Sequence, residues 1–390
     1  MRTILHCDLN SFYASVEIYL NPSLRGKAVA VCGSKEERHG IVLAKSDKAK
    51  LRGVKTAEAI WEAQRKCPEL IIIPPHFDEY VRFSRMVRKI YEDYTDLVEP
   101  FGMDECWLDV TASERLFGNG EKIAHTIRER VKKETGLTIS VGVSFNKVFA
   151  KLGSDMKKPD AVTIIPYENF REIIYNLPAS DMLGVGPNTA KTLRNYCIDT
   201  IGDIAAANKN FLIKRLGKTG ECIWNYANGL DSSPVHSTDY QAPVKSVGRG
   251  TTCPADLSSC EEVKNVIMNL SQEVAHQLRK HSLKANSVQL SVKDKNLFVK
   301  QFQAALNSPT KCFWDISEKA FELFVSNYDW HDKIRAITVR AINLSDDDEP
   351  EQMDFFCDSV TKEKRNNAEC AIELIRSKYG SDVINIARLS

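Results

Sequence analysis

A polar stretch at residues 231–244 constrains the fold most, because it divides the chain into two parts that must each build a core. Pro234 and Pro243 stand there among several serines and threonines, a composition typical of a linker. The chain has 390 residues, of which 43% are hydrophobic and 27% are charged. That length and composition predict several globular domains and exclude a disordered chain or a coiled-coil rod.

The part before the linker alternates short apolar strands with helices. Residues 3–9 predict a strand and Asn10–Leu20 a helix, while strands at Leu97–Phe101 and Glu105–Val110 flank a tight turn. The alternation lacks the regular parallel order of a doubly wound fold, so we expect an α+β sheet with helices on one face. Residues 176–228 show almost no strand pattern and predict a small helical domain.

The part after the linker predicts a second α/β domain. A helix at residues 260–281 precedes β-rich stretches at 286–304 and 333–344. An acidic run at residues 346–351 then opens a tail, and helical spacing returns at Ala368–Leu389. The net charge of +1 therefore conceals a mildly basic body, which is only a weak sign of a polyanionic partner.

The sequence also excludes several classes of protein. No stretch approaches the roughly 18 apolar residues that a membrane helix needs. Asp8 and Asn10 interrupt the apolar N-terminal segment that a signal peptide would require. The 11 cysteines include no C-x-x-C pair, so neither a zinc site nor a disulfide framework is indicated. We therefore expect reduced thiols in a cytoplasmic protein without a membrane partner.

Three carboxylates are the first candidates for chemistry. Asp8 ends an apolar strand, and Asp104 and Glu105 stand where a later strand begins. Three carboxylates at strand ends can hold two Mg²⁺ ions roughly 3.5–4 Å apart, which suits in-line phosphoryl transfer. The alternative makes Asp8 a helix N-cap and Asp104 a turn residue. Because consecutive strand residues point to opposite faces, Asp104 and Glu105 share a site only if the turn rotates one of them.

A second candidate is the Gly-x-Gly hairpin at Gly184-Val185-Gly186. Backbone N–H groups of such a hairpin, at the start of a helix, can receive a DNA phosphate without reading bases. Lys191 and Arg194 add positive charge on the helix that follows. The pattern is typical of a helix-hairpin-helix element, and an ordinary turn between two helices is the alternative.

Two further segments carry less specific signals. The lysine-studded stretch from Ser144 to Pro159 could present Lys158 to a triphosphate, although such lysines usually form a solvated helix face. Gln352–Phe356 places two aromatic residues in a polar tail, which suggests an anchor for the groove of a partner. The alternative is that these aromatic side chains fold back onto this protein.

Taken together, four motifs resemble the Y-family DNA polymerases, which are translesion enzymes. They occur in the order and at the spacing of that family, and the similarity covers residues 1 to about 345. The motifs are Asp8–Glu17, Gly102–Asp109, Ser144–Lys147 with Lys158-Pro159, and Gly184-Val185-Gly186.

The resemblance implies a right-hand polymerase with palm, small fingers, a helical thumb and an α/β little finger. The palm is expected at residues 1–20 and 71–166, the fingers at 21–70, the thumb with its helix-hairpin-helix at 167–230, the linker at 231–243, the little finger at 244–345, and an acidic C-terminal tail at 346–390. The implied activity is low-fidelity, template-directed addition of dNTPs to a primer 3′-OH past DNA lesions, with two Mg²⁺ ions. The setting would be the SOS-type damage response of a bacterium, with a monomeric enzyme in the cytoplasm that associates with the nucleoid when it works.

The resemblance also assigns roles to individual residues. Asp8, Asp104 and Glu105 are implied to be the catalytic, metal-binding carboxylates, joined by the Leu9 carbonyl. Tyr13 matches the steric-gate position, where an aromatic ring clashes with a ribonucleotide 2′-OH. The remaining implied contacts are Phe12 packing beneath Tyr13, Lys158 on the triphosphate, Gly184, Gly186, Lys191 and Arg249 on DNA, and Gln352, Met353, Phe355 and Phe356 on a bacterial sliding clamp.

Two positions depart from the family pattern. Many members offer a Tyr and, three residues later, an Arg to the triphosphate, where this chain has Asp47 and Lys50. Asp47 would repel phosphate, whereas Lys50 can neutralise it as a point charge without the bidentate fork of Arg. We hypothesise that Lys50, with Lys45 or Lys48, makes this contact. At the clamp segment, Met353 and Phe355 stand where Leu is more usual.

Three other functions fit some of these features. A two-metal nuclease or a nucleotide cyclase could use the same three carboxylates, but Tyr13 under the sugar and the thumb hairpin speak against a cyclase. A nuclease would cut DNA without dNTPs. A catalytically silent DNA-binding scaffold is disfavoured by the intact Asp8, Asp104 and Glu105.

Overall fold

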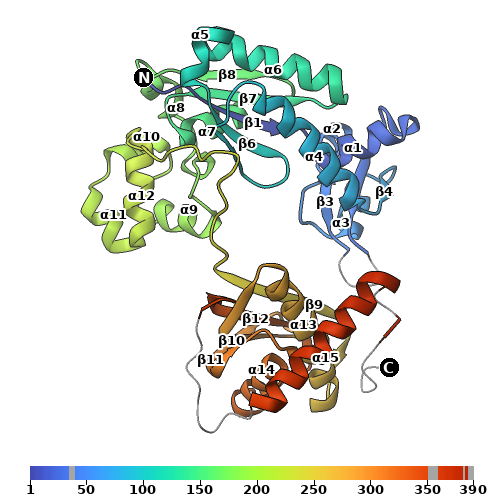
Figure 1. The fold of residues 1–390 in the computed structure, drawn as a ribbon. Helices are drawn as coiled ribbons and strands as arrows, with labels where there is room; N and C mark the ends of the chain where they lie inside the picture. Colours follow the sequence, from blue (N-terminus) through green and yellow to red (C-terminus); the bar gives the residue numbers. More distant parts are fainter. Residues whose placement is uncertain (35–39, 350–358, 381–382, 385–390) are drawn as a thin grey trace. The chain divides into compact units, whose positions relative to one another are not determined.

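The chain forms two compact units (Figure 1). The structure, a computed structural model, describes residues 1–34, 40–349, 359–380 and 383–384. The first unit covers Met1–Gly33 and Gly40–Gln241, and the second begins at Ala242. Within the described part of the chain, no helix has the length and apolar character to cross a bilayer, and no disulfide joins two cysteines.

The main sheet of the first unit has β1 at its centre. Its order is β5-β6-β1-β7-β8, with antiparallel pairs throughout except for the parallel pair of β7 and β8. The end of β1 lies beside the start of β6, which brings Asp8 directly across from Glu105. The strands are β1 (Ile4–Leu9), β5 (Val98–Pro100), β6 (Glu105–Asp109), β7 (Ile139–Ser144) and β8 (Val162–Ile165).

Helices cover both faces of this sheet, which corrects the expectation of helices on one face. On one face of the sheet, Leu5, Cys7 and Leu9 of β1 lie in a large apolar cluster together with residues of a first set of helices. The opposite face of β1 and β7 packs against α7, where a Cβ on Gly142 would lie 1.9 Å from the Ala150 carbonyl oxygen. The first set comprises α1 (Phe12–Leu20), α4 (Phe77–Glu92) and α6 (Gly120–Thr135), with the short α5 (Glu114–Phe117) beside it; α7 is Lys147–Met156.

A small second sheet follows α1 in the chain. Its order is β3-β2-β4, with β2 antiparallel to β3 and parallel to β4, and it has its own apolar cluster. The elements are β2 (Val29–Cys32), β3 (Val42–Lys45), α2 (Asp47–Leu51), α3 (Ile60–Lys66) and β4 (Ile71–Ile73).

The helical segment predicted at residues 176–228 is confirmed. Short helices pack around another apolar cluster, which also includes Val148 and Phe149 of α7. Local signals set their boundaries: the Asn208 side chain accepts a hydrogen bond from the Phe211 backbone N–H, 3.1 Å away, and so caps α11. The helices are α8 (Phe170–Ile174), α9 (Pro187–Arg194), α10 (Ile201–Ala206), α11 (Lys209–Leu216) and α12 (Lys218–Ala227).

The second unit is a four-stranded antiparallel sheet in the order β11-β10-β12-β9, with α13 and α14 packed on one face. The expected helix at 260–281 is present, and the β-rich stretch at 286–304 divides into β10 and β11. Two elements were not predicted, β9 and α14. The bounds are β9 (Ser246–Leu257), α13 (Cys260–Lys280), β10 (Leu283–Asp294), β11 (Val299–Thr310), α14 (Phe313–Asn327) and β12 (Ile334–Asp346).

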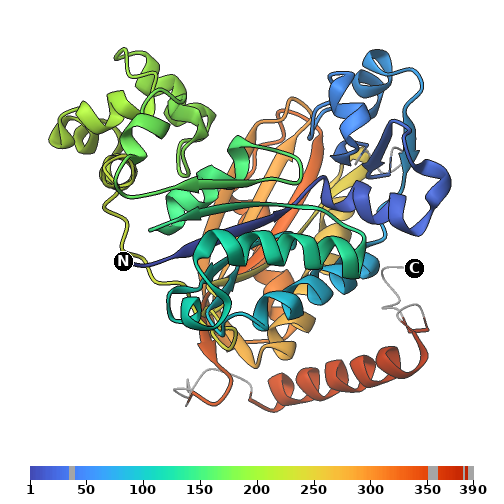
Figure 2. The same ribbon diagram turned by 90° about the horizontal axis from the view of Figure 1, so that it is seen from above.

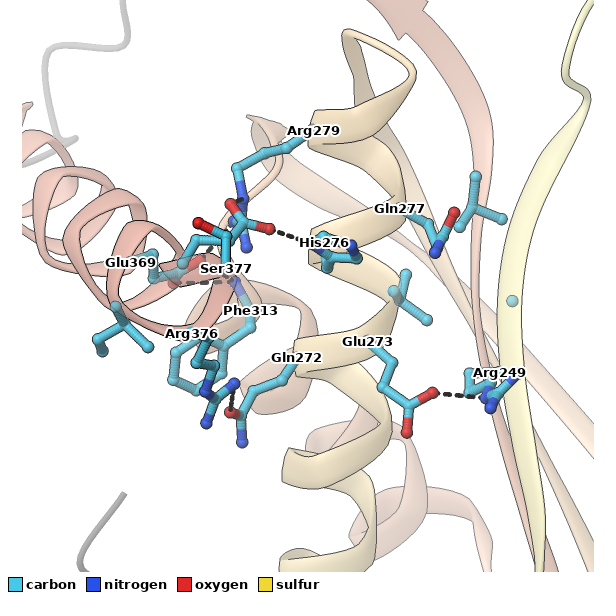
Figure 3. A pocket seen from close by; sticks show the side chains of 15 residues that line it. Arg249, Gln272, Glu273, His276, Gln277, Arg279, Phe313, Glu369, Arg376 and Ser377 are labelled. Carbon is cyan, nitrogen blue, oxygen red and sulfur yellow. Dashed lines mark hydrogen bonds and ion pairs between the residues drawn. The ribbon is translucent and has the colours of Figure 1, made fainter. Parts of the chain in front are cut away.

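A final helix, α15 (Ser359–Tyr379), packs against α13 and the start of α14 beside a cavity of about 620 Å³ (Figure 3). Arg279 of α13 forms ion pairs with Glu369 (2.8 Å) and Glu373 (2.6 Å) of α15. The sequence predicted a helix over Ala368–Leu389, but α15 ends at Tyr379. Gly380 follows with a φ of +100°. Part of the remaining tail lies outside the described residues.

Candidate active site and nucleic-acid contact surfaces

A cavity of about 300 Å³ lies where the end of β1 meets the start of β6. Asp8 and Glu105 are direct partners in the antiparallel register, so their side chains leave the same face of the sheet. Asp104 lines the same cavity. The structure therefore brings together the three carboxylates that the sequence singled out, with Leu9, Phe12, Lys50 and Lys158 in the same lining.

Asp104 reaches this site because it lies in the bend before β6, where side chains do not yet alternate. Its carbonyl accepts a hydrogen bond from the Leu9 backbone N–H at 3.0 Å. The turn is fixed further by Arg88, which donates to the Gly102 carbonyl at 2.8 Å, and by the Ser84 hydroxyl, which donates to the Met103 carbonyl. Gly102 has a φ of +92°, a conformation that favours glycine.

The Asp104 carboxyl is electrostatically coupled to the other two. Burial, followed by the negative charges of Asp8 and Glu105, raises its pKa from 3.8 to about 6. The carboxylate is contacted by the backbone N–H of Asp104 itself, but it is unpaired in the sense that no other described residue donates a hydrogen bond to it or forms an ion pair with it. An unpaired carboxylate beside two others is a costly arrangement that a bound cation would relieve.

Glu105 is held from behind by two residues that sequence analysis did not identify. His6 Nε2 lies 3.2 Å and Lys151 Nζ lies 2.7 Å from Glu105 Oε2. Burial alone would raise the pKa of Glu105, but the contacts with His6 and Lys151 outweigh it and lower the pKa to about 2. The signal for His6 was its place two residues before Asp8, which puts both side chains on one face of β1.

Asp8 is paired with the lysine that was expected on the triphosphate. Lys158 Nζ lies 2.8 Å from Asp8 Oδ2 and 2.8 Å from Asp155 Oδ1. Burial raises the pKa of Asp8, and the charge of Lys158 offsets part of that effect. The Lys158 ammonium therefore lies directly at the carboxylate cluster.

The donor set suits a divalent cation of the Mg²⁺ type, which prefers carboxylate and carbonyl oxygens. The unpaired Asp104 carboxylate is the observation that favours a cation here. Across the described residues, however, no three His, Cys, Asp or Glu side chains already converge as a metal site. Lys158 on Asp8 and Lys151 on Glu105 each occupy a carboxylate oxygen.

Tyr13 is the second residue of α1, directly after Phe12, and lies near the turn that carries Asp104. Its ring stacks on Tyr80 with centroids 4.2 Å apart, and its hydroxyl donates to Met103 Sδ at 3.4 Å. Burial and then the charge of Asp104 raise the pKa of Tyr13. Phe12 is 3% exposed and lines the cavity. The two rings therefore form one packed aromatic group beside Asp104.

Of the three lysines considered for the triphosphate, Lys45 and Lys50 line the cavity and Lys48 does not. Lys45 and Lys50 line the cavity with Asp47, and the Lys45 ammonium donates to Thr56 Oγ1 at 2.9 Å. Lys48 instead donates to the Gly26 carbonyl at 2.9 Å. Asp47 Oδ1 lies 3.4 Å from the Ser11 hydroxyl, which donates to it.

The Gly184–Gly186 hairpin has the geometry expected at the start of a helix. Gly184 has a φ of +89°, Gly186 is the N-cap of α9, and both are exposed while Val185 between them is buried. Lys191 is exposed on α9. The hairpin therefore presents backbone and positive charge to solvent.

Arg249 points to the helix-covered face of its sheet. It pairs across β9 and β12 with the buried Val339, and its guanidinium lies 2.5 Å from Glu273 of α13. The opposite face of the sheet carries Arg340, opposite Gly248. The register places further side chains on that face, among them Gln289, Ser291, Lys293, Gln301, Gln303 and Thr338, and none of these is acidic.

The four clamp-segment residues, Gln352, Met353, Phe355 and Phe356, lie outside the described residues.

Comparisons with known proteins identify the family. Residues 7–155 match the impB/mucB/samB family, and residues 244–355 match the C-terminal domain of that family. DNA polymerase IV of Acetivibrio thermocellus is 49% identical over 379 residues, which are 97% of this chain and 95% of that protein. DNA polymerase IV 1 of Bacillus subtilis is 36% identical over 385 residues, 98% of this chain and 92% of that protein.

A solved structure supports the fold. A Y-family DNA polymerase chimera of Dbh and Dpo4 matches with a TM-score of 0.76 at 24% identity, covering 87% of this chain and 98% of the chimera. The α+β architecture with palm, fingers, thumb and little finger fits that fold. The chain therefore belongs to the impB/mucB/samB family of Y-family translesion DNA polymerases.

Proposed function

We propose that this DNA-directed DNA polymerase adds dNTPs to a primer 3′-OH with Asp8, Asp104 and Glu105 as its metal-binding catalytic carboxylates. The single observation that carries this proposal is the unpaired Asp104, whose pKa is raised to about 6 beside two other carboxyls. Two Mg²⁺ ions held by these carboxylates and the Leu9 carbonyl would lower the pKa of the primer 3′-OH and neutralise the leaving pyrophosphate.

The residues of the chain supply positioning and charge. Lys158 neutralises Asp8 in this structure and, released from it, would reach the triphosphate. Lys50 and Lys45 line the same cavity and would contact the same phosphates as point charges. Asp47 lines the same cavity, where its carboxylate accepts from the Ser11 hydroxyl. Catalysis then comes from orientation and electrostatic stabilisation.

Tyr13 is proposed as the steric gate that excludes ribonucleotides. Its stacking on Tyr80 and its hydroxyl contact with Met103 hold the ring next to the turn that carries Asp104. Phe12 packs behind it, so the ring cannot easily move aside for a 2′-OH.

The domain boundaries are proposed as palm at residues 1–20 and 71–166, fingers at 21–70, thumb at 167–230, linker at 231–243 and little finger at 244–345. Gly184, Gly186 and Lys191 of the thumb would grip the DNA backbone, so affinity should fall with salt. Arg249 would have to leave Glu273 to reach a phosphate. The open face with Arg340 and Lys293 supports a second backbone contact on the little finger.

The cellular role is proposed from the family and the tail. The enzyme would act as a monomer in SOS-type damage tolerance in the bacterial cytoplasm, associated with the nucleoid while it works. Gln352, Met353, Phe355 and Phe356 would bind the sliding clamp, with Met353 and Phe355 in place of the more usual Leu.

Primer extension tests the core of this proposal. Purified protein with Mg²⁺ should extend a primer with dNTPs and not with rNTPs. Tyr13→Ala should raise rNTP use relative to dNTP use at least about tenfold, a change of about 1.4 kcal/mol in discrimination. Tyr19→Ala, an exposed residue at the far end of the same helix, is the matched control. Equal rNTP discrimination in both variants would contradict the role of Tyr13, and DNA cleavage without dNTPs would favour a nuclease.

A further inference from the structure

His6 is fully buried on the face of β1 that carries Asp8. Its ring lies between two polar side chains. Nδ1 is 2.8 Å from Ser154 Oγ of α7, and Nε2 is 3.2 Å from Glu105 Oε2 of β6. The edge of Trp107 packs on the ring with centroids 5.2 Å apart, so the imidazole has little freedom to rotate.

The chemistry of the three groups fixes the direction of the chain of contacts. A carboxylate only accepts hydrogen bonds, so the His6 contact with Glu105 requires the proton on Nε2. Nδ1 can then only accept. The Ser154 hydroxyl lies 2.8 Å from Nδ1 and donates to the Lys151 carbonyl at 2.7 Å, so its single proton must turn from that carbonyl to Nδ1. Ser154 is itself fully buried.

The two carboxylate oxygens of Glu105 differ in their contacts. His6 and Lys151 both approach Oε2, whereas Oε1 has no partner among the described residues. Neither His6 Nε2 nor Glu105 Oε2 has an aligned hydrogen bond in this structure although the atoms are 3.2 Å apart. A rotation of the carboxylate would align this contact.

We infer that His6, supported by Ser154, is a positioning residue that orients Glu105 for nucleotidyl transfer. The inference rests on the proposed role of Glu105 and adds residues that do not touch substrate. Groups behind a metal-binding carboxylate typically change metal affinity or activity by roughly 10–100-fold when they are removed.

The test compares two substitutions of His6. His6→Leu removes both polar contacts, whereas His6→Gln keeps an N–H donor near the place of Nε2. The first readout is binding without chemistry: dNTP binding to the enzyme on a dideoxy-terminated primer, titrated with Mg²⁺. His6→Leu should need roughly 10-fold more Mg²⁺ or beyond, and His6→Gln should stay within about 3-fold of the unchanged enzyme.

The second readout separates positioning from general damage to the fold. At saturating Mg²⁺, His6→Leu should lower the rate of single-nucleotide insertion and leave the dNTP KM unchanged, and His6→Gln should restore the rate. In a Glu105→Gln background, His6→Leu should add no further loss, because the group that it positions is already gone. An unchanged Mg²⁺ requirement in His6→Leu, or a full additional loss in the Glu105→Gln background, would overturn the inference.

Two controls keep the outcome decisive. If His6→Leu lacks a cooperative thermal transition, Ser154→Ala takes its place: a raised Mg²⁺ requirement supports the inference and an unchanged one refutes it. Glu105→Gln alone tests the proposed function separately. If that variant inserts nucleotides at the unchanged rate, the proposed role of Glu105 fails, whatever His6 does.

Discussion

Each unit of this polymerase holds a carboxylate beside the start of a secondary-structure element, Asp104 before β6 and Glu369 at the start of α14, and the two are partnered in opposite ways. Asp104 in the first unit is half-buried, and burial with the charges of Asp8 and Glu105 raises its pKa to about 6. Burial also raises the pKa of Glu369, but there Arg279 and hydrogen bonds offset part of the effect. Glu369 in the second unit is 4% exposed and fully engaged. It pairs with Arg279 at 2.8 Å and accepts from the Phe313 backbone N–H at 3.0 Å.

The difference separates a structural carboxylate from a functional one. The start of α14 has no side-chain cap of its own, because its N-cap residue is Cys312, and Glu369 supplies the missing acceptor from α15 (Figure 3). Nothing comparable satisfies Asp104 among the described residues. A group that costs stability in the free protein is the better candidate for binding a cation.

The largest expected effect is the loss of catalysis in Asp104→Asn. The substitution keeps the shape of the side chain and removes the charge, so single-nucleotide insertion should fall by about a thousandfold or more, roughly 4 kcal/mol of transition-state stabilisation. Rapid-quench primer extension measures it. A loss below about tenfold would place the functional carboxylate elsewhere.

The second unit should respond in the opposite way. Glu369→Gln breaks a buried ion pair and should lower the free energy of unfolding of that unit by about 3 kcal/mol. Urea unfolding and protease cleavage of α15 report the change. Insertion well below the unfolding midpoint should stay unchanged. Equal stability with impaired insertion would reverse the roles assigned to the two carboxylates.

The lysines beside the carboxylates should give a smaller and more selective effect. Lys50→Ala removes a cation from the cavity and should raise the KM for dNTPs about tenfold, as expected for the loss of one charged phosphate contact. Lys48→Ala is the matched control, because Lys48 lies on the same short helix as Lys50 but donates to the Gly26 carbonyl. The hypothesis fails if both variants keep the unchanged KM.

The smallest effect is a pH dependence of stability measured in EDTA. Because the pKa of Asp104 is raised on folding, its protonation contributes to stability. This contribution is fully present below pH about 3.8 and is lost as the pH rises through about 6. The lowered pKa of Glu105 acts oppositely, because its contribution is present above pH about 4.5 and is lost as the pH falls toward 2.

Unfolding midpoints between pH 4 and 6 distinguish these two groups. Asp104→Asn should remove the decline in stability that Asp104 causes across this window as the pH rises. Glu105→Gln should change the profile mainly below pH 4.5. Parallel profiles for Asp104→Asn and the unchanged protein would show that the Asp104 carboxyl is not perturbed.

Much of the architecture could be predicted because strong local patterns carry it. The strand at residues 3–9 and the turn before Glu105 predicted where the carboxylate site lies. The polar stretch at residues 231–244 contains the boundary between the two units. The strand β9 was missed because Gly248 and Gly250 interrupt its apolar alternation. A Cβ on Gly250 would lie 2.2 Å from Thr338 Oγ1, a cross-strand approach that no local pattern records.

Other parts depend on contacts between distant residues. Helix α14 had a usable signal, since Phe313, Ile316, Ala320 and Phe324 follow helical spacing and are buried. The spacing of His6 and Asp8 places both on one face of β1, but the contacts of His6 and Lys151 with Glu105 could not be predicted, because they form only when β1, β6 and α7 are assembled. The direction of Arg249 likewise depends on the register of β9 with β12.

The most direct test of the central claim is Mn²⁺ binding, followed by electron paramagnetic resonance, in three proteins at neutral pH. The account predicts that the unchanged chain and Glu369→Gln bind Mn²⁺ alike, while Asp104→Asn binds at least about tenfold more weakly. Equal Mn²⁺ affinity in Asp104→Asn and the unchanged chain would contradict the claim that the unpaired carboxylate marks the cation site of this polymerase.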